Sequence, residues 1–314
     1  MSFTYDREVA AFVPYAPPVD ATKVDQTREM LLEFGKQKPV WNPGENTEYS
    51  VHEVPGVEGA PAVEVHVLRT KSGNGDRPAL LWFHGGGFVL GDARESLPFL
   101  EPIVTGNDAV AVSVQYRLSP ETHYPGPLDD GYAAYSWLRD NAAELGVDPG
   151  RIAVGGQSAG GALAAGLAQR VRDEGGSFCF QLLDIPVTDD RGTTESATDY
   201  TDSLVWHRTN AEASWRHYLG ETSDAPAYAA PNRAEDLSGL PPAFITVNQF
   251  DPLRDEGMEY ARRLAHAGVL TELHMYPGTF HGSASMAPTA QVSLRQIADL
   301  HAAIGRAFSS PSEG

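Results

Sequence analysis

Gly156-Gln157-Ser158-Ala159-Gly160 is the stretch that decides the fold of this chain. The apolar run 152–154 precedes it and predicts a buried strand, and the Ala- and Leu-rich segment 161–171 follows it and predicts a helix. Ser158 therefore lies on a tight turn between a strand and a helix. Glycine is expected two positions before and after the serine, because a Cβ atom there would collide with the neighbouring strand or helix. A glycine-rich turn with an incidental serine would look the same over these five residues, so the rest of the chain must decide.

The composition indicates a globular, acidic protein. The 314 residues are 41% hydrophobic, which suffices for one large α/β domain with inserted pieces. The chain has 23 Lys and Arg residues and 42 Asp and Glu residues, which gives a net charge of −19. This charge argues against nucleic-acid and anionic-membrane partners, since both need clustered cations, and tolerance of high salt is an alternative interpretation of it. The single cysteine allows no internal disulfide.

The sequence also bears on cellular location. Charged residues, Asp6 to Glu8, interrupt the first stretch, so no basic-then-apolar leader is recognised. No run approaches the roughly 18 apolar residues of a membrane span. We therefore expect a cytoplasmic protein without a membrane partner.

Eight strands are expected, and from the third onward they alternate with helices. They are predicted at residues 49–54, 63–69, 79–83, 109–116, 152–154, 180–187, 243–247 and 271–276. The first two alternate apolar and polar residues, as half-buried antiparallel strands do, whereas 79–83 is apolar throughout, as a central strand is. Strands alternating with helices imply a mostly parallel sheet covered on both faces. Residues 1–45, with one helix at 21–34, form an appendage, and residues 188–232 form an inserted helical piece.

Four polar or glycine-rich features directly follow predicted strands: residues 84–87, Ser158, Asp251 and His281. The carboxyl ends of parallel strands meet at one edge of the sheet, which is where ligands bind in such folds. We therefore expect these features to lie close together.

A serine hydroxyl needs a base to take its proton, and the base needs an acid to orient it. His281 suits the base, since an imidazole titrates near neutral pH, while His274 lies inside the last strand and is expected to be structural. Asp251 ends a strand and suits the acid; Asp255 and Glu256 fall in the next helix and are expected to solvate or cap it. The alternative is a buried ion pair at Asp251 with an unrelated His281.

Acyl transfer also needs donors for the negative charge that develops on the carbonyl oxygen. The His84-Gly85-Gly86-Gly87 run offers main-chain N–H groups that no side chain obstructs, and Ala159 offers another. Such donors are typically worth a factor of roughly 10² to 10³ each. The glycine spacings of phosphate-binding loops are absent. No His, Cys or carboxylate cluster has metal-ligand spacing, so we expect no metal and no cofactor.

Taken together, these motifs resemble the bacterial hormone-sensitive-lipase-like family (family IV) of α/β-hydrolase esterases. The resemblance rests on His84-Gly85-Gly86-Gly87-Phe88, Tyr116-Arg117-Leu118-Ser119-Pro120-Glu121, Leu128-Asp129-Asp130, Gly156-Gln157-Ser158-Ala159-Gly160-Gly161, Asp251-Pro252-Leu253-Arg254-Asp255-Glu256 and His281-Gly282. It implies an α/β-hydrolase fold with an eight-stranded, mostly parallel sheet flanked by helices. Residues 46–187 and 233–314 would form the catalytic domain, and residues 1–45 and 188–232 a helical cap.

The resemblance also implies site residues. Ser158, Asp251 and His281 would form the catalytic triad, in the chain order expected for this fold. Gly86, Gly87 and Ala159 would form the oxyanion hole, with His84 and Gly85 supporting its loop. Candidate walls of the substrate pocket, for which core packing is an equal alternative, are Phe88, Gln157, Trp206 and Leu253.

The implied function is a serine carboxylesterase for short- to medium-chain acyl esters. The sequence lacks an obvious amphipathic, strongly apolar lid for a lipid interface, which argues against a long-chain lipase. Lactone, carbamate, amide or acetyl-group hydrolysis remains open, as does a non-catalytic small-molecule-binding protein. A homodimer through the last strand is a hypothesis taken from the family.

Four positions depart from the family pattern. Position 157 is usually Asp or Thr and is Gln here, position 119 is usually Ala and is Ser here, and position 283 is often Phe and is Ser here. Gln157 and Ser283 lie near the site and could alter substrate preference. Asp184 interrupts an otherwise apolar strand, and we expect it to pair with a basic residue.

Overall fold

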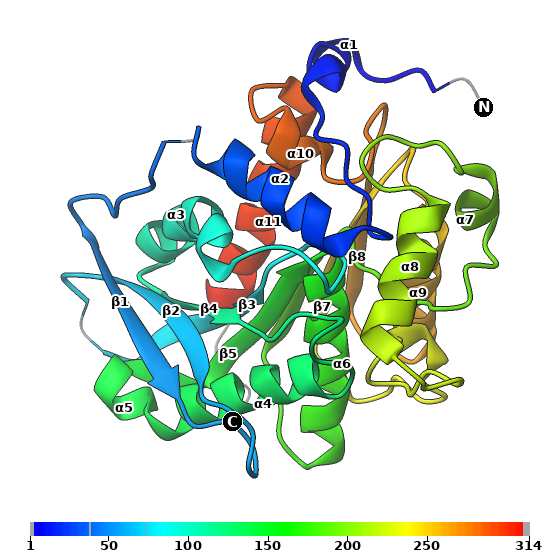
Figure 1. Ribbon diagram of the computed structural model, residues 1–314. Helices are drawn as coiled ribbons and strands as arrows, with labels where there is room; N and C mark the ends of the chain where they lie inside the picture. Colours follow the sequence, from blue (N-terminus) through cyan, green and yellow to red (C-terminus); the bar gives the residue numbers. More distant parts are fainter. Residues whose placement is uncertain (1–2, 38, 74, 310–314) are drawn as a thin grey trace.

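The computed structural model describes residues 3–37, 39–73 and 75–309. Its centre is one eight-stranded sheet in the order β1-β2-β4-β3-β5-β6-β7-β8 (Figure 1). The strands are β1 Thr47–Val54, β2 Val63–Thr70, β3 Arg77–Phe83, β4 Val110–Gln115, β5 Val147–Gln157, β6 Phe180–Asp184, β7 Ala243–Asn248 and β8 Thr271–Tyr276. β2 pairs antiparallel with β1 and β4, and every other neighbouring pair is parallel. The eight-stranded, mostly parallel sheet expected from the sequence is confirmed.

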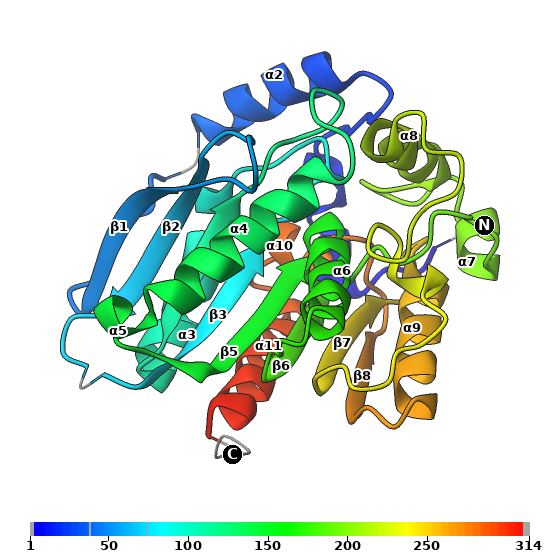
Figure 2. The same ribbon diagram turned by 90° about the horizontal axis from the view of Figure 1, so that it is seen from below.

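Helices cover both faces of this sheet. They are α1 Arg7–Ala10, α2 Val24–Gly35, α3 Leu97–Asn107, α4 Gly126–Asp140, α5 Ala142–Leu145, α6 Ala159–Asp173, α7 Glu195–Asp199, α8 Arg208–Leu219, α9 Arg254–His266, α10 Ser283–Met286 and α11 Gln291–Ser309. Short 3-10 turns lie at Val13–Tyr15, Ala93–Ser96 and Pro231–Arg233. One face packs on α4, α6 and α9, and the other packs on α3 and α11 (Figure 2). In the described part of the chain, no helix is both long enough and apolar enough to cross a membrane.

The strand β3 shows why the sheet is covered on both sides. All seven of its residues are buried. Leu81 and Phe83 belong to the core under α4 and α6, whereas Leu80 and Trp82 belong to the core under α3 and α11. Successive side chains of a strand point to opposite faces, so an uninterrupted apolar run requires a helix layer on each side.

Some element bounds differ from those expected. β5 begins at Val147 rather than at residue 152, because Val147 pairs with Arg77 before a shift in register. β6 ends at Asp184 rather than at residue 187, because Ile185 takes φ +43° and Pro186 has no N–H to donate. The N-terminal segment holds α1 in addition to the expected helix, whose observed form, α2, begins at Val24 rather than at residue 21.

Two segments far apart in sequence lie together beyond the carboxyl ends of the parallel strands. They are the N-terminal segment that leads into α2, and α8, which follows β6 (Figure 1). Asn210 of α8 donates through Nδ2 to the Val19 carbonyl oxygen at 3.0 Å and accepts from the Ala21 N–H at 2.9 Å. These bonds tie the two segments into one cover over that edge of the sheet.

Candidate active site

Ser158 lies between β5 and α6 in a strained backbone conformation, with φ 54° and ψ −118°. A Cβ atom at Gly156 would lie 2.2 Å from the Gly160 carbonyl oxygen, and one at Gly160 would lie 2.1 Å from the Phe83 carbonyl oxygen. Only glycine therefore fits at either position, as expected from the sequence. Such backbone strain costs on the order of 1–3 kcal/mol and persists only where the surroundings enforce it.

Ser158, His281 and Asp251 form a continuous hydrogen-bonded chain. The Ser158 hydroxyl donates to His281 Nε2 at 2.8 Å, and His281 Nδ1–H donates to Asp251 Oδ2 at 2.7 Å. Asp251 follows β7 and His281 follows β8, so the predicted meeting of these side chains at one sheet edge is observed. All three are buried, and Asp251 is only 1% exposed.

Hydrogen bonds from the main chain and from a neighbouring amide hold the last two members in place. The second oxygen of Asp251, Oδ1, accepts from the Leu253 N–H at 2.9 Å. Asn248, at the end of β7, donates through Nδ2 to the Phe280 carbonyl oxygen at 2.8 Å, directly before His281. The carboxylate and the imidazole are thus oriented independently of any bound molecule.

The glycine loop after β3 borders the serine. A Cβ atom at Gly85 would lie 3.5 Å from the Ser158 Cβ. Gly86 and Gly87 take φ +118° and +60°, which glycine adopts at little cost. Within the described residues, the N–H groups of Gly86, Gly87 and Ala159 donate no hydrogen bond. Gly87 and Ala159 are buried and Gly86 is half-buried, and main-chain donors in such places are rarely left unpaired, so these three can donate to a bound oxygen.

His84 stabilises this loop through hydrogen bonds and a ring stack. Its Nδ1–H donates to the Gly85 carbonyl oxygen at 2.7 Å, and the Tyr116 hydroxyl donates to the His84 carbonyl oxygen at 2.9 Å. The two rings stack with centroids 4.2 Å apart. Burial lowers the pKa of His84 to about 4, so the imidazole is neutral near pH 7.

The cover over the sheet edge contacts the same loop directly. The Ser214 hydroxyl, on α8, donates to the Gly87 carbonyl oxygen at 2.6 Å. The Trp206 ring lies 5.9 Å from the His281 ring, centroid to centroid, and a Cβ atom at Gly87 would meet its Cη2 at 2.2 Å. Ser214 carries no local signal in the sequence, because 127 residues separate it from Gly87.

The candidate pocket residues occupy different environments. Phe88 is fully buried and stacks on Tyr218 with centroids 3.9 Å apart. Leu253 is buried in the core beside Asp251, and Trp206 is buried between the loop and His281. Gln157 is half-buried next to the serine. Of the four, Trp206 lies against both the glycine loop and His281, whereas the Gln157 amide lies beside Gly85 of that loop.

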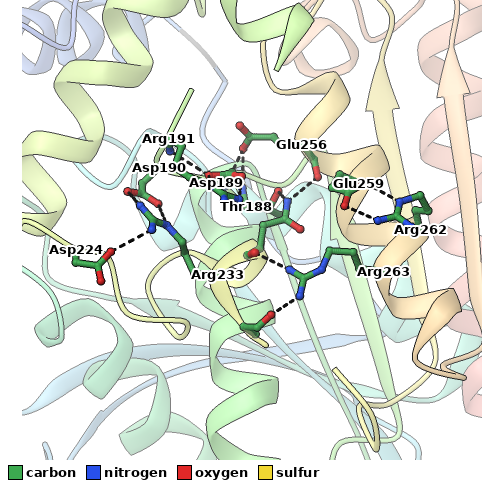
Figure 3. A network of polar contacts seen from close by, with 12 residues as sticks. Thr188, Asp189, Asp190, Arg191, Asp224, Arg233, Glu256, Glu259, Arg262 and Arg263 are labelled. Atoms are coloured by element: carbon green, nitrogen blue, oxygen red, sulfur yellow. Dashed lines mark hydrogen bonds and ion pairs between the residues drawn. The ribbon is translucent and has the colours of Figure 1, made fainter. Parts of the chain in front are cut away.

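Glu256 corrects one sequence-based expectation. It does not solvate or cap its helix: it is 2% exposed, and its Oε1 accepts from the Thr188 N–H at 2.7 Å and the Asp189 N–H at 3.3 Å. Burial raises the pKa of Glu256 well above its usual range. Figure 3 shows this carboxyl among the polar contacts that join α9 to the chain after β6. The ion pair of Arg233 with Asp190, drawn beside them, joins two parts of the segment between β6 and β7.

Asp184 corrects another expectation. No described basic residue pairs with it; its carboxylate instead accepts from Gln157 Nε2 at 2.8 Å, Thr246 Oγ1 at 2.6 Å and Gln296 Nε2 at 2.8 Å. Its side chain is 4% exposed. Three neutral donors thus satisfy a buried carboxylate beside the turn that carries Ser158.

The structure describes no group of three or more His, Cys, Asp or Glu side chains suited to a metal ion among residues 3–37, 39–73 and 75–309. The sequence-based expectation of a metal-free, cofactor-free site stays a prediction.

Comparisons with known proteins agree with this architecture. A family model described as an alpha/beta hydrolase fold matches residues 80–285. Esterase LipI of Mycobacterium tuberculosis is 41% identical over 232 residues, covering 73% of this chain and 72% of that protein. Carboxylesterase NlhH of the same organism is 41% identical over 238 residues, covering 74% of each. The structure of a bacterial heroin esterase superposes with a TM-score of 0.94 at 45% identity, covering 98% of this chain and 99% of that one.

Proposed function

The chain belongs to the α/β-hydrolase fold family, in its hormone-sensitive-lipase-like branch, and is a carboxylic ester hydrolase; within that class we propose that it is a serine carboxylesterase for short- to medium-chain acyl esters. The observation that carries the proposal is the chain of hydrogen bonds from the Ser158 hydroxyl through His281 to Asp251. A serine paired with a base that is itself oriented by an acid is the arrangement that nucleophilic acyl transfer needs.

In this proposal, Ser158 Oγ attacks the ester carbonyl carbon while His281 Nε2 takes the hydroxyl proton. Asp251 stabilises the imidazolium that forms. The tetrahedral intermediate then breaks its bond to the alcohol oxygen, and His281 returns the proton to the departing alcohol. Water attacks the acyl-enzyme by the same route and releases the acid and the free serine.

The negative carbonyl oxygen of each intermediate accepts from the N–H groups of Gly86, Gly87 and Ala159. Support comes from their freedom from other partners and from the position of the loop beside the serine. Main-chain donors that are already oriented stabilise the transition state without reorganisation during the reaction. His84 and Gly85 keep the loop in that conformation through the Nδ1–H bond.

The division into domains is part of the proposal. Residues 46–187 and 233–314 form the catalytic domain, and residues 1–45 and 188–232 form the cap. The bonds of Asn210 to Val19 and Ala21 support a cap made from both segments. Buried aromatic side chains of the cap, Trp206 above all, lie against the glycine loop and His281 and limit the space for a long acyl chain.

We also propose a homodimer through β8, in keeping with the hypothesis drawn from the family. β8 is an edge strand whose Leu273 and Met275 are exposed, by 36% and 52%. Unpaired edge strands with apolar side chains favour pairing with another strand. Sedimentation that gives a monomer at micromolar concentration would refute this assembly. The cytoplasmic location stays a prediction.

The main test is hydrolysis of p-nitrophenyl esters from acetate to palmitate by the wild type and by Ser158→Ala. We expect fast turnover of the short chains and a loss on the order of 10⁴-fold or more in the variant, at unchanged thermal stability. Fastest turnover on palmitate would contradict the chain-length proposal. A wild type that neither hydrolyses any ester nor reacts with an organophosphate at Ser158 would point instead to a non-catalytic binding protein.

A further inference from the structure

We propose that Asp184 is a positioning residue for ester hydrolysis, holding the Gln157 amide against the glycine loop that follows β3. This inference rests on the proposed function, because it assigns a role within the same site. Asp184 touches neither His281 nor Asp251 in the described structure, so it acts on the reaction only through its neighbours.

The first observation is how Asp184 contacts the nucleophile turn twice. Its main-chain carbonyl oxygen accepts from the Ser158 N–H at 2.8 Å. Its carboxylate accepts from the Nε2 of Gln157, the residue before the nucleophile, at 2.8 Å. One residue of β6 therefore holds the backbone of the serine and the side chain beside it.

The second observation concerns the direction of the Gln157 amide. A carboxylate only accepts hydrogen bonds, so it selects the amide orientation with Nε2 toward Asp184. Oε1 then lies on the other side, 3.4 Å from the position that a Cβ atom of Gly85 would occupy. The Gln157 side chain thus spans from the buried carboxylate to the loop that carries Gly86 and Gly87.

The third observation is the fixed position of Asp184 itself. Thr246 on β7 and Gln296 on α11 both donate to its Oδ1, at 2.6 and 2.8 Å. The next residue, Ile185, has φ +43°, which is rare for a β-branched side chain, and its N–H donates to both the Thr246 carbonyl and hydroxyl oxygens. Strain of this kind clusters at functional sites, where the surroundings enforce it.

These contacts connect β5, β6, β7 and α11 to the two parts that must meet in the transition state, the nucleophile and the oxyanion donors. A displacement of about 1 Å in such parts costs up to roughly 10²-fold in rate. Because Asp184 does not border the substrate, its loss should lower kcat and leave KM nearly unchanged.

The test begins with Asp184→Asn. The new amide keeps one acceptor for Thr246 and Gln296 but turns an N–H toward Gln157 Nε2. The Gln157 amide then either loses this hydrogen bond or flips, which turns its Nε2 in place of Oε1 toward the glycine loop. We expect kcat on p-nitrophenyl acetate to fall by about 10-fold, with KM within about twofold of the wild type. Gln157→Met, which removes both amide atoms at a half-buried position, should lower kcat to a similar extent.

A double-mutant cycle identifies the route of the effect. If Asp184 acts through Gln157, Asp184→Asn combined with Gln157→Met should be no slower than either single variant. Asp184→Asn combined with Gln157→Glu should recover most of the lost kcat, since the Glu carboxylate accepts from the new amide. Purely additive losses, or a Gln157→Met variant with wild-type kcat, would overturn the inference.

The matched control is Asp299→Asn. Asp299 is a carboxylate on α11 that accepts from the Tyr276 hydroxyl at 2.8 Å and contacts His274 Nδ1 at 3.2 Å, and in the described part of the chain it makes no hydrogen bond to Gln157, Ser158 or Asp184. We expect it to lower thermal stability without changing kcat, which separates positioning from general loosening. An active wild type whose kcat survives Asp184→Asn refutes this inference alone; a wild type without ester hydrolysis refutes the proposed function and this inference with it.

Discussion

Main-chain contacts hold the turn that carries Ser158, whereas side chains from the segment between β6 and β7 hold the glycine loop after β3. At the turn, Gly156 and Gly160 lie so close to main-chain oxygens that no side chain fits. At the cap, side chains make the contacts: Ser214 donates to the Gly87 carbonyl oxygen and the Trp206 ring packs against that loop. Backbone contacts in a packed core cannot yield, whereas side-chain contacts can be exchanged one at a time.

This difference indicates where substrate preference can change without loss of the fold. The nucleophile is positioned by the sheet and by glycine, so its geometry is set once the core has folded. The glycine loop after β3 is held by His84 through the Gly85 carbonyl oxygen and by Ser214 of α8 through the Gly87 carbonyl oxygen, so substitutions in α8 act on this loop.

The largest loss of folding stability is expected for Gly160→Ala, which tests the main-chain contacts at the turn. The added Cβ would lie 2.1 Å from the Phe83 carbonyl oxygen and 2.4 Å from that of His84, so the strand and the helix must separate. We expect destabilisation of about 4 kcal/mol or more, or no folded protein. Chemical denaturation measures the effect.

Gly106→Ala is the matched control for this substitution. Gly106 lies in α3, is exposed, and has no atom within 4 Å of an added Cβ. It should raise stability by about 0.5–1 kcal/mol, since alanine favours helix more than glycine does. Equal behaviour of the two variants would contradict the role assigned to the backbone contact.

The next effect concerns the junction between the cap and the core, where Glu256 is buried (Figure 3). Its pKa in the folded protein is raised above the usual value of 4.5. Below that pH, Glu256 is protonated in both the folded and the unfolded protein. Above it, the unfolded protein binds fewer protons than the folded protein, so the free energy of unfolding falls as pH rises. Glu256→Gln lacks this dependence, and its stability relative to the wild type should rise with pH by at most about 1.4 kcal/mol per unit.

Thermal unfolding between pH 4 and pH 8 gives the measurement. Glu259→Gln serves as the control on the same helix, because Arg262 lowers the pKa of Glu259, whose carboxylate pairs with it at 2.7 Å. A carboxyl with a lowered pKa stabilises above its unfolded pKa and loses that contribution as pH falls, which is the opposite sign. A constant difference between Glu256→Gln and the wild type across this range would contradict a raised pKa.

The smallest effect is expected on the cap side, for Ser214→Ala. It removes one hydrogen bond to the Gly87 carbonyl oxygen, worth about 1 kcal/mol. We expect kcat/KM for p-nitrophenyl acetate to fall by about 5- to 10-fold, together with a loss of about 1 kcal/mol in the free energy of unfolding. Ser293→Ala removes another buried serine hydroxyl, one without a partner in the described structure, and should leave activity unchanged. If both variants retain full activity, the cap does not hold the loop.

The candidate site could be predicted to a large extent because its residues follow strands. Ser158, Asp251 and His281 each lie within a few residues of a strand end, and parallel strands bring those ends to one edge. The errors arose where local pattern is ambiguous. Residues 185–187 are apolar enough to continue β6, yet the positive φ of Ile185 ends it.

Partners of buried polar residues could not be predicted in this way. Asp184 was expected to meet a cation and meets Gln157, Thr246 and Gln296, the last 112 residues away. Glu256 was expected at the helix surface and is buried against the Thr188 and Asp189 N–H groups. A single charged residue in a sequence carries no information on which donor will reach it after folding.

By itself, the sequence determined the class of sheet, the order of the motifs and the side chains that meet at its edge, because apolar periodicity and glycine spacing act over a few residues. Only the tertiary structure decided which groups hold that edge in place: Asp184 at the turn that carries Ser158, Ser214 and Trp206 at the glycine loop after β3, and Glu256 at the junction of α9 with the chain after β6. These contacts join segments that are distant along the chain, and such contacts are set by packing rather than by any local pattern.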